Sequence, residues 1–412
     1  MTAKIITVVL ALTFCRDALL VQLDKLETSL PEMTRSADVA AERLLAGGNL
    51  YAAGREPFVI ESYTRAGGMM MLERYGDESV LSEHDVILVG AWKSDDEVAL
   101  AVCRRAKDAG AYVVLFAPAF KAPHAALREM CDMHVVNFSA PDTPMVAIGE
   151  KQWALPMSRL ANVTALWTYT AELVSALTRR GKMPVMWQSS VLPGGRERNG
   201  RYHGAADRSK RRFHEDMTVK PQPAGLLGGR YIDAVRRQVM GLRGPVLEQL
   251  ADAAGQMAEC VRNGGSVHVQ SVSHFTTYEL MSEPVPAWIK AVYEWRLKGL
   301  VKPEQLVENM KPGDIFFLLG YYKVAVDHKL STGYVEAVRK AGAKSILALC
   351  HAPIAPLDGP QPDMLIDAQW EYGDAAVSIS GYDVKILPSS GVLQTVVFWT
   401  VVAETERLLG QE

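Results

Sequence analysis

The stretch DVILVGAWKSDDEVALAVCRRAKDAGAYVVLF, residues 85–116, determines how this chain folds. Residues 86–90 are a continuous apolar run, residues 91–96 read as a polar loop, and residues 97–109 predict a helix. Gly110 ends that helix, since glycine tolerates the positive φ of a helix C-terminus, and residues 112–116 are again apolar throughout. Continuous apolar strands that alternate with helices are typical of a parallel sheet covered on both faces.

The strand–helix–strand unit recurs in the second half of the chain. Residues 314–319 predict a strand that is apolar from Ile315 onward, the following helix is predicted to end near Ala341, and residues 344–349 predict the next strand. In each half a helical stretch that runs into a Gly-Gly pair and a short strand precedes this unit, at residues 37–54 and at residues 251–271. The order of elements is therefore the same in both halves.

A third repeated element closes each half. Residues 154–158 precede one long helix, and residues 386–390 precede another. Because three units recur in the same order, we interpret the chain as two homologous α/β domains in tandem. The predicted limits are residues 1–200 for the first domain, 201–228 for a linker or excursion, and 229–412 for the second domain.

The linker region carries a local excess of positive charge. Residues 196–220 hold eight Lys and Arg against four Asp and Glu. Such a run is typical of a solvated linker, and it would also suit a loop that faces an anion. The sequence leaves both interpretations open.

Composition places the chain among ordinary globular proteins. Its 412 residues are enough for two domains, 49% of them are hydrophobic, and the formal net charge is −3. These values exclude a largely disordered chain and a multi-span membrane protein, and the lack of a basic excess argues against a dedicated nucleic-acid binder. The five cysteines are scattered without a CxxC pair, which predicts neither a disulfide framework nor a zinc site.

The N-terminus allows two interpretations. Lys4 precedes an apolar run over residues 5–14, which is too short to span a bilayer but long enough for the core of an export signal. Arg16 and Asp17 follow at once, without a clear cleavage site of small residues. We expect an apolar first helix in a cytoplasmic protein, with export as the alternative if residues 1–20 are a signal peptide.

Several longer motifs carry a resemblance to a known family. The order of helix, Gly-Gly and strand, followed by AKDAGAYVVL, resembles the sugar isomerase (SIS) domain superfamily. Within that superfamily the chain is similar to an uncharacterised bacterial branch. The stretches of this chain that resemble motifs of that branch are FVIESYTRAGGMMML (residues 58–72), VMWQSSVLPGGRERN (185–199), VHVQSVSHF (267–275) and LPSSGVLQTVVFW (387–399).

The resemblance implies a fold and a function. The fold is two tandem three-layer α/β/α SIS-like domains, each with a mostly parallel five-stranded sheet, paired within the chain as a pseudo-dimer. The function is binding of a phosphosugar or related carbohydrate derivative at the carboxyl ends of the strands, with aldose–ketose isomerisation as the enzymatic form. The expected partner is a small molecule, and we expect no cofactor, no nucleic acid and no membrane span. The resemblance is also compatible with a homo-oligomer.

The first phosphate loop is degenerate. In the family, Ser, Thr and Gly residues cradle phosphate at a helix N-terminus, whereas residues 90–97 read GAWKSDDE. Lys93 and Ser94 are the remaining candidates for ligand binding. Asp95 and Asp96 would repel phosphate, and they suit a helix N-terminus as capping residues.

The second phosphate loop, residues 320–324, also lacks the Ser/Thr pattern. Lys323 is the candidate here, with Ser331 and Thr332 downstream. Two degenerate loops predict weaker phosphosugar binding, a different ligand or none. They leave open an alternative function, a non-catalytic SIS-fold sensor or scaffold.

Isomerisation of an aldose needs a base and an acid, usually a carboxylate and a histidine. His274 follows a strand at a position where the family branch also has a histidine, although a surface or capping role is the alternative. Glu61 is a candidate base, or simply the start of a helix. His351 follows a later strand and is predicted to face the same cleft as His274. Two histidines without a third ligand at a telling spacing predict no metal site.

Hydroxyl and cationic side chains complete the predicted site. Ser389 and Ser390 precede a helix, so capping is their alternative role, and Ser158 with Arg159 is their first-half counterpart. Arg65 could contact a ligand or pair with a carboxylate. The predicted ligand contacts are Ser271, Ser273, Ser389, Ser390, Lys93, Ser94, Lys323 and Arg65.

Overall fold

The computed structural model describes most of the chain. It leaves out residues 1, 94, 121–125, 140–145, 149–150, 154–156, 205–207, 216, 283–284, 293–300, 322–329, 352–358 and 411–412. For residues 2–11, 146–148, 151–153, 208–209, 282 and 330–332 it describes the backbone alone. Ser94 and Lys323, two of the predicted ligand contacts, therefore lie outside the described residues.

The first half builds a parallel five-stranded sheet with the order β2-β1-β3-β4-β5. Leu50 pairs with Val86, and Val86 pairs with Tyr112, so the apolar runs align across the sheet. Helices cover both faces, which explains why the central strands are apolar at every position. The strands are β1 (Leu50–Gly54), β2 (Leu72–Arg74), β3 (Val86–Gly90), β4 (Tyr112–Ala117) and β5 (Met133–Val136).

The second half repeats this sheet. Its strands are also parallel, in the order β12-β11-β10-β8-β9, which is the order of the first sheet read from the other end. The predicted tandem repeat is thus confirmed. The strands are β8 (Val267–Ser271), β9 (Ile289–Ala291), β10 (Ile315–Gly320), β11 (Lys344–His351) and β12 (Met364–Glu371); β6 (Val146–Ile148) pairs antiparallel with β7 (Lys151–Trp153), and β13 (Ala375–Val377) with β14 (Ile386–Pro388).

Helices give each half three layers. Helix α4 covers one face of the first sheet, while α2 and α6 cover the other. In the second half α11 and α12 cover one face, and α9 and α13 the other. The helices are α1 (Thr2–Thr28), α2 (Leu30–Leu45), α3 (Phe58–Ser62), α4 (Glu97–Asp108), α5 (Ala126–Glu129), α6 (Met157–Arg179), α7 (Gly195–His203), α8 (Leu226–Gly241), α9 (Pro245–Arg262), α10 (His274–Ser282), α11 (Pro303–Val307), α12 (Leu330–Lys340) and α13 (Ser390–Leu409), with a 3-10 turn η1 (Arg208–Arg211).

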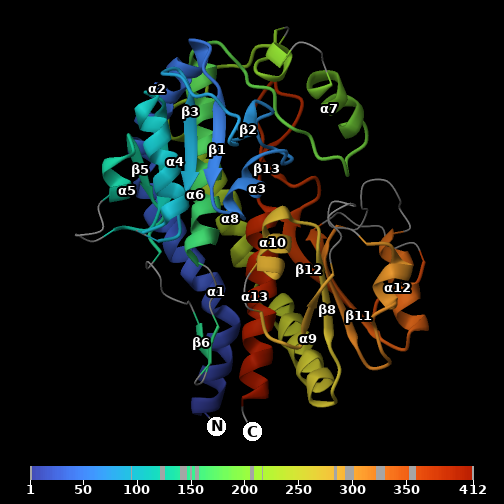
Figure 1. The fold of residues 1–412 in the computed structure, drawn as a ribbon. Coiled ribbons are helices and arrows are strands. Elements are labelled where there is room, and N and C mark those ends of the chain that lie inside the picture. Colours follow the sequence, from blue (N-terminus) through green and yellow to red (C-terminus); the bar gives the residue numbers. More distant parts are fainter. Residues whose placement is uncertain are drawn as a thin grey trace.

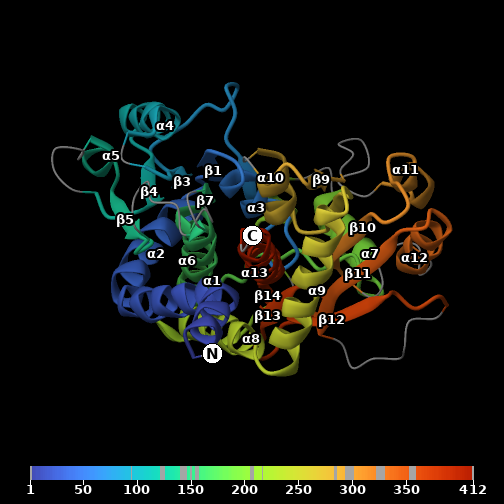
Figure 2. The same cartoon turned by 90° about the horizontal axis from the view of Figure 1, so that it is seen from below.

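The two halves meet through α6 and α13. These two helices contact each other and lie between the two sheets (Figure 2). Nearly every residue of both is buried, polar ones included. A helix that is buried all round belongs to the core of a protein, so one continuous core joins the halves as a pseudo-dimer.

The two halves share an aspartate at the start of each sheet that joins two strands by a hydrogen bond, and we call this contact the aspartate clamp. In the first half the Asp85 carboxylate accepts a hydrogen bond from the backbone N–H of Asn49 at 2.6 Å. In the second half Asp314 accepts one from the N–H of Ser266 at 2.9 Å. Each clamp joins the beginnings of the two adjacent central strands.

The apolar N-terminal run lies in α1, in agreement with the predicted first helix. Leu19, Leu23 and Leu26 are buried, and α1 packs on α8 and α13 (Figure 1). Among the helices that the structure describes, none has both the length and the apolar character of a membrane span. The predicted domain limits fall inside α7 and α8 and remain a prediction.

Candidate functional site

Most of the side chains predicted for the site meet where the two halves join. Here α3 of the first half packs against α10 of the second, close to the start of α13 (Figure 1). The carboxyl ends of β8 and β10 reach the same place. The predicted residues found at this junction are Glu61, Arg65, Ser271, Ser273, His274, Ser389 and Ser390.

A buried ion network spans the junction. Nη2 of Arg65 donates to Oδ2 of Asp374 at 2.7 Å and to Oγ of Ser390 at 3.0 Å. Nε of Arg65 lies 3.2 Å from Oε1 of Glu61. We call Glu61, Arg65, Asp374 and Ser390 the junction cluster; all four are buried, and each half supplies two of them.

Asp374 is the member of the junction cluster that the sequence did not predict. It follows Gly373 and adopts a φ of 70°, a left-handed conformation that Asp tolerates better than most residues. Its partner Arg65 lies 309 positions away in the chain. The only local feature in the sequence is the Gly373-Asp374 pair, which predicts a turn but not an ion pair with Arg65.

The start of α13 is already neutralised by the protein itself. The N–H of Ser390 donates to Oδ1 of Asp374 at 3.0 Å. Oε1 of Glu61 lies against Gly391, where an added Cβ would come within 2.6 Å of it. A helix N-terminus attracts anions, and here two carboxylates of the chain occupy that position. Oγ of Ser389 is buried and has no hydrogen-bond partner among the described residues.

Glu61 is the titratable group of the junction cluster. Burial raises its pKa to about 7, and the nearby charge of Asp374 acts in the same direction, whereas Arg65 and the N–H of Phe275 lower it. Against the desolvation of burial, Asp374 and Glu61 hold the pKa of Arg65 above its ordinary value. One guanidinium faces two carboxylates, so the carboxyl of Glu61 is poised to take up a proton near neutral pH.

The predicted hydroxyl ligands tie the end of β8 and the turn before α10 to α13. Oγ of Ser271 donates to Oε1 of Gln394 at 2.7 Å, and the N–H of Ser273 donates back to Oγ of Ser271 at 3.1 Å. Hydroxyls of Thr276 and Thr395 lie 2.9 Å apart across the same contact. All five side chains are buried, so this network fixes α10 in place.

His274 begins α10 and faces the first half. Its Nδ1 lies 3.3 Å from the carbonyl oxygen of Ile60, and its side chain is half-buried. The next N–H along, that of Phe275, donates to Oε2 of Glu61 at 3.2 Å. The structure therefore brings the predicted acid and base candidates to the same pair of facing helices.

The carboxyl edge of the first sheet has a different chemistry. Asp96 is buried and caps α4, because its carboxylate accepts from the N–H of Ala99 at 3.2 Å, which confirms the predicted capping role. Nε of Arg55 donates to the same carboxylate at 3.0 Å. Lys93 is exposed and pairs with Asp95 at 3.3 Å. Charged side chains therefore remain within reach of solvent at this edge.

Two arginines lie over one tryptophan at this edge. The guanidinium of Arg159, near the start of α6, lies 3.7 Å from the ring centroid of Trp92, and that of Arg55 lies 6.0 Å from it. Nη1 of Arg159 also donates to Oε1 of Glu279 at 3.0 Å. Glu279 is fully buried on α10, so the second half supplies the carboxylate. We call Arg55, Trp92 and Arg159 the arginine–tryptophan cluster.

His351 lies at the carboxyl end of β11, and its side chain is exposed. Nδ1 of His351 lies 2.6 Å from Oδ2 of Asp367 on the neighbouring strand β12. This pair lies within the second sheet, and a cleft shared with His274 remains a prediction. The described part of the chain also holds no group of three or more His, Cys, Asp or Glu side chains suited to a metal ion.

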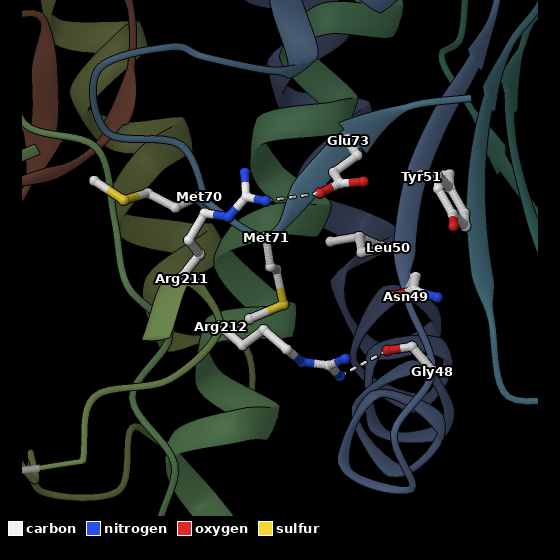
Figure 3. Close-up of a pocket in the computed structure, with 9 residues that line it drawn as sticks. All are labelled: Gly48, Asn49, Leu50, Tyr51, Met70, Met71, Glu73, Arg211 and Arg212. Carbon is white, nitrogen blue, oxygen red and sulfur yellow. Dashed lines mark hydrogen bonds and ion pairs between the residues drawn. The ribbon is translucent and has the colours of Figure 1, made fainter. Parts of the chain in front are cut away.

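Two hollows lie at the opposite, amino ends of the sheets. The first has a volume of about 350 Å³ and is lined by Gly48, Asn49, Leu50, Tyr51, Met70, Met71, Glu73, Arg211 and Arg212 (Figure 3). The second has a volume of about 530 Å³, and its lining includes Ser266, His268, Lys290, Lys311 and Asp314. We call them the first and the second amino-edge hollow. Neither includes a residue of the predicted site.

Comparison with known proteins identifies similar structures, but it finds no matching sequence family. No family model and no curated protein matches the chain. Among solved structures, the C-terminal domain of glucosamine-fructose-6-phosphate aminotransferase from Francisella tularensis is 11% identical with a TM-score of 0.50, and the match covers 95% of this chain and 97% of that one.

Two further solved structures are similar over part or most of the chain. Glucosamine-6-phosphate deaminase from Thermotoga maritima is 10% identical with a TM-score of 0.41, and the match covers 94% of this chain and 92% of that one. A phosphoheptose isomerase from Francisella tularensis is 14% identical with a TM-score of 0.29, over 45% of this chain and 96% of that one.

Two parallel five-stranded sheets, each covered by helices on both faces and joined through α6 and α13, agree with the match along the aminotransferase domain. The chain has the fold of two tandem sugar isomerase (SIS) domains.

Proposed function

We propose that the chain binds a phosphorylated sugar or a related carbohydrate derivative at the carboxyl edge of the first sheet, without isomerising it. The observation that supports this most is the arginine–tryptophan cluster, in which two guanidinium groups lie over the Trp92 ring. Ligands of open parallel sheets bind at the carboxyl ends of the strands, which is where this cluster lies.

The chemistry of the cluster suits such a ligand. A guanidinium presents paired N–H donors that match the oxygens of a phosphate group. An aromatic face packs against apolar surface, and one face of a sugar ring presents mainly C–H groups. The side chain of Arg55 is 39% exposed and that of Lys93 is 47% exposed, so both can be reached from solvent. Asp96 and Glu279 hold the two guanidinium groups in place.

The junction cluster supports the non-catalytic alternative. Isomerisation needs a carboxylate and a histidine that face a bound sugar. Glu61 and His274 are the right residue types, but Glu61 is 1% exposed and is engaged by Arg65 and by the N–H of Phe275. A base that is held in this way has to break an ion pair before it can reach a substrate carbon.

Calorimetric titration with a panel of sugar phosphates and the matching free sugars tests the binding proposal. We expect one phosphorylated ligand to bind, and we expect Arg55→Ala to weaken it about tenfold to a hundredfold, as for loss of a charge-assisted hydrogen bond. Arg105→Ala is the matched control, because Arg105 also lies over an aromatic ring, that of Tyr75, at 5.2 Å. If a folded sample binds no member of the panel, the proposal fails.

An isomerase assay with the bound ligand tests the second part of the proposal. We expect no conversion between aldose and ketose forms at saturating ligand. Conversion that disappears in both Glu61→Gln and His274→Ala would refute the non-catalytic assignment. The binding part would stand, because the two measurements have separate readouts.

A further inference from the structure

The two halves carry equivalent hollows that differ in charge at one matching position of their sheets. At the amino end of the first sheet Tyr51 on β1 pairs with Glu73 on β2, and both line the first amino-edge hollow. At the same register position of the second sheet His268 on β8 pairs with Lys290 on β9, and both line the second amino-edge hollow. A carboxylate in one hollow thus corresponds to an ammonium group in the other.

In the first amino-edge hollow, arginines of the basic linker pair with groups of the chain itself. Nη2 of Arg211 lies 3.7 Å from Oε1 of Glu73 (Figure 3). Nη2 of Arg212 donates to the carbonyl oxygens of Leu44 at 2.7 Å and of Gly48 at 2.6 Å, and so caps the end of α2. The charges of this hollow already have partners inside the chain.

The second amino-edge hollow keeps positive charge without such partners. Lys290 and Lys311 are exposed, and within the described ranges neither forms an ion pair; Nζ of Lys290 donates to the neutral carbonyl oxygen of Ala287 at 3.1 Å. Both lysines line the hollow. Two ammonium groups therefore face a concave space of about 530 Å³, a volume typical of small-molecule sites.

Asp314 does not cancel this charge by ion pairing. Its carboxylate accepts hydrogen bonds from the N–H groups of Ser266 at 2.9 Å and Lys311 at 2.8 Å, and Nε2 of His268 lies 3.1 Å from Oδ2. Burial lowers the pKa of His268 although Asp314 opposes the effect, so at neutral pH the imidazole is an uncharged donor. The carboxylate is thus bound by neutral groups of the fold.

We propose that the second amino-edge hollow is a binding site for a small doubly charged anion, held by Lys290 and Lys311. The site lies at the edge of the sheet opposite to the arginine–tryptophan cluster and does not depend on the proposed function. Phosphate and dicarboxylate groups share the required charge. Lysine binds either of them as a point charge on a flexible stem.

Titration with inorganic phosphate and, separately, with succinate tests this site. The titrations use the full chain in the Arg55→Ala background, which removes the main phosphate contact at the carboxyl edge of the first sheet. We expect saturable binding of at least one of the two dianions. Lys290→Glu, which installs the charge found at the equivalent position of the first half, should weaken that binding at least tenfold, and Lys311→Ala severalfold.

Lys344→Ala is the control, because Lys344 is exposed at the amino end of the neighbouring strand β11 and does not line the hollow. It should leave the affinity unchanged. Lys290 is exposed, so an unaltered unfolding midpoint will show that Lys290→Glu is folded. Absence of saturable binding of both dianions, or equal binding by folded Lys290→Glu, overturns the proposal.

Discussion

Helices α6 and α13 occupy equivalent places in the two halves, but the charged side chains around their first turns differ in their contacts. At the start of α13, Asp374 and Glu61 surround Arg65 and neutralise the helix end. Near the start of α6, Arg159 takes part in a cluster with Trp92, and its carboxylate partner is Glu279.

In both places one glutamate comes from the other half of the chain. Glu61 lies on α3 and reaches the start of α13, while Glu279 lies on α10 and reaches Arg159 on α6. Because α3 and α10 follow the corresponding strands β1 and β8, this exchange is a feature of the paired fold. The start of α13 is therefore neutralised within the chain, whereas the carboxyl edge of the first sheet also carries Arg55, whose side chain is 39% exposed.

The largest effect expected from this comparison is on stability. Arg65→Met leaves the buried carboxylates of Glu61 and Asp374 without their cation, and loss of one partner from a buried ion pair costs about 3–5 kcal/mol. Urea unfolding measures this change. The exposed Arg105 gives the matched variant Arg105→Met, which should lose less than about 0.5 kcal/mol. Equal losses in the two variants would mean that the junction cluster contributes nothing specific.

The second effect is a pH dependence caused by Glu61. Its pKa is about 7 in the fold against an ordinary value of 4.5, so the folded state binds the extra proton and is destabilised as pH rises from 4.5 to 7. Relative to Glu61→Gln, which does not titrate, the wild type should lose on the order of 1–3 kcal/mol over that interval. Urea unfolding at pH 5 and pH 7.5 checks it, and a constant difference between the two proteins would contradict the raised pKa.

A third effect tests how tightly Glu61 fits against α13. In Gly391→Ala the added Cβ would lie 2.6 Å from Oε1 of Glu61, and overpacking of this kind costs about 1–3 kcal/mol. Gly255→Ala in α9 is the control, since no atom lies within 4 Å of its added Cβ, and Ala there should stabilise the helix by up to about 1 kcal/mol. Opposite signs for the two variants are the expected result; a neutral Gly391→Ala would show that Glu61 is free to move.

The smallest effect concerns Lys93, which is exposed at the carboxyl edge of the first sheet. Lys93→Ala removes a surface ion pair with Asp95, so the free energy of unfolding should change by less than about 0.5 kcal/mol. The affinity for a phosphorylated ligand should fall about twofold to fivefold, as expected for a solvent-exposed charge. If Lys93→Ala lost as much affinity as Arg55→Ala, the ligand would be centred on Lys93 and not on Trp92.

The fold could be predicted from the sequence because its signals are local. Each apolar run, such as residues 86–90 and 112–116, is long enough for one buried strand, and the glycine after each helix marks the turn. The repetition of these units then predicted two sheets, which the structure confirms. Capping by Asp96 was predictable for the same reason, since a cap depends on the next three residues.

The site was harder to predict because its contacts join distant segments. Arg65 was proposed to contact a ligand or a carboxylate, but its partner Asp374 has no sequence pattern that connects it to the RAGG segment. Trp92 lies within the degenerate loop, and its role depends on Arg159 from another helix. The amino-edge hollows depend on the register of β2 and β9, which are only three residues long and carry little periodic signal.

We infer that a ligand binds beside the arginine–tryptophan cluster, and that carboxylates of the chain itself occupy the start of α13. The most direct measurement is the affinity of one sugar phosphate for the wild type, Arg55→Ala and Ser390→Ala, by calorimetry on folded samples. We expect at least a tenfold loss of affinity in Arg55→Ala and no change in Ser390→Ala, whose hydroxyl is bound to Arg65 within the protein. A loss of affinity in Ser390→Ala with an unchanged affinity in Arg55→Ala would show instead that the ligand binds at the start of α13.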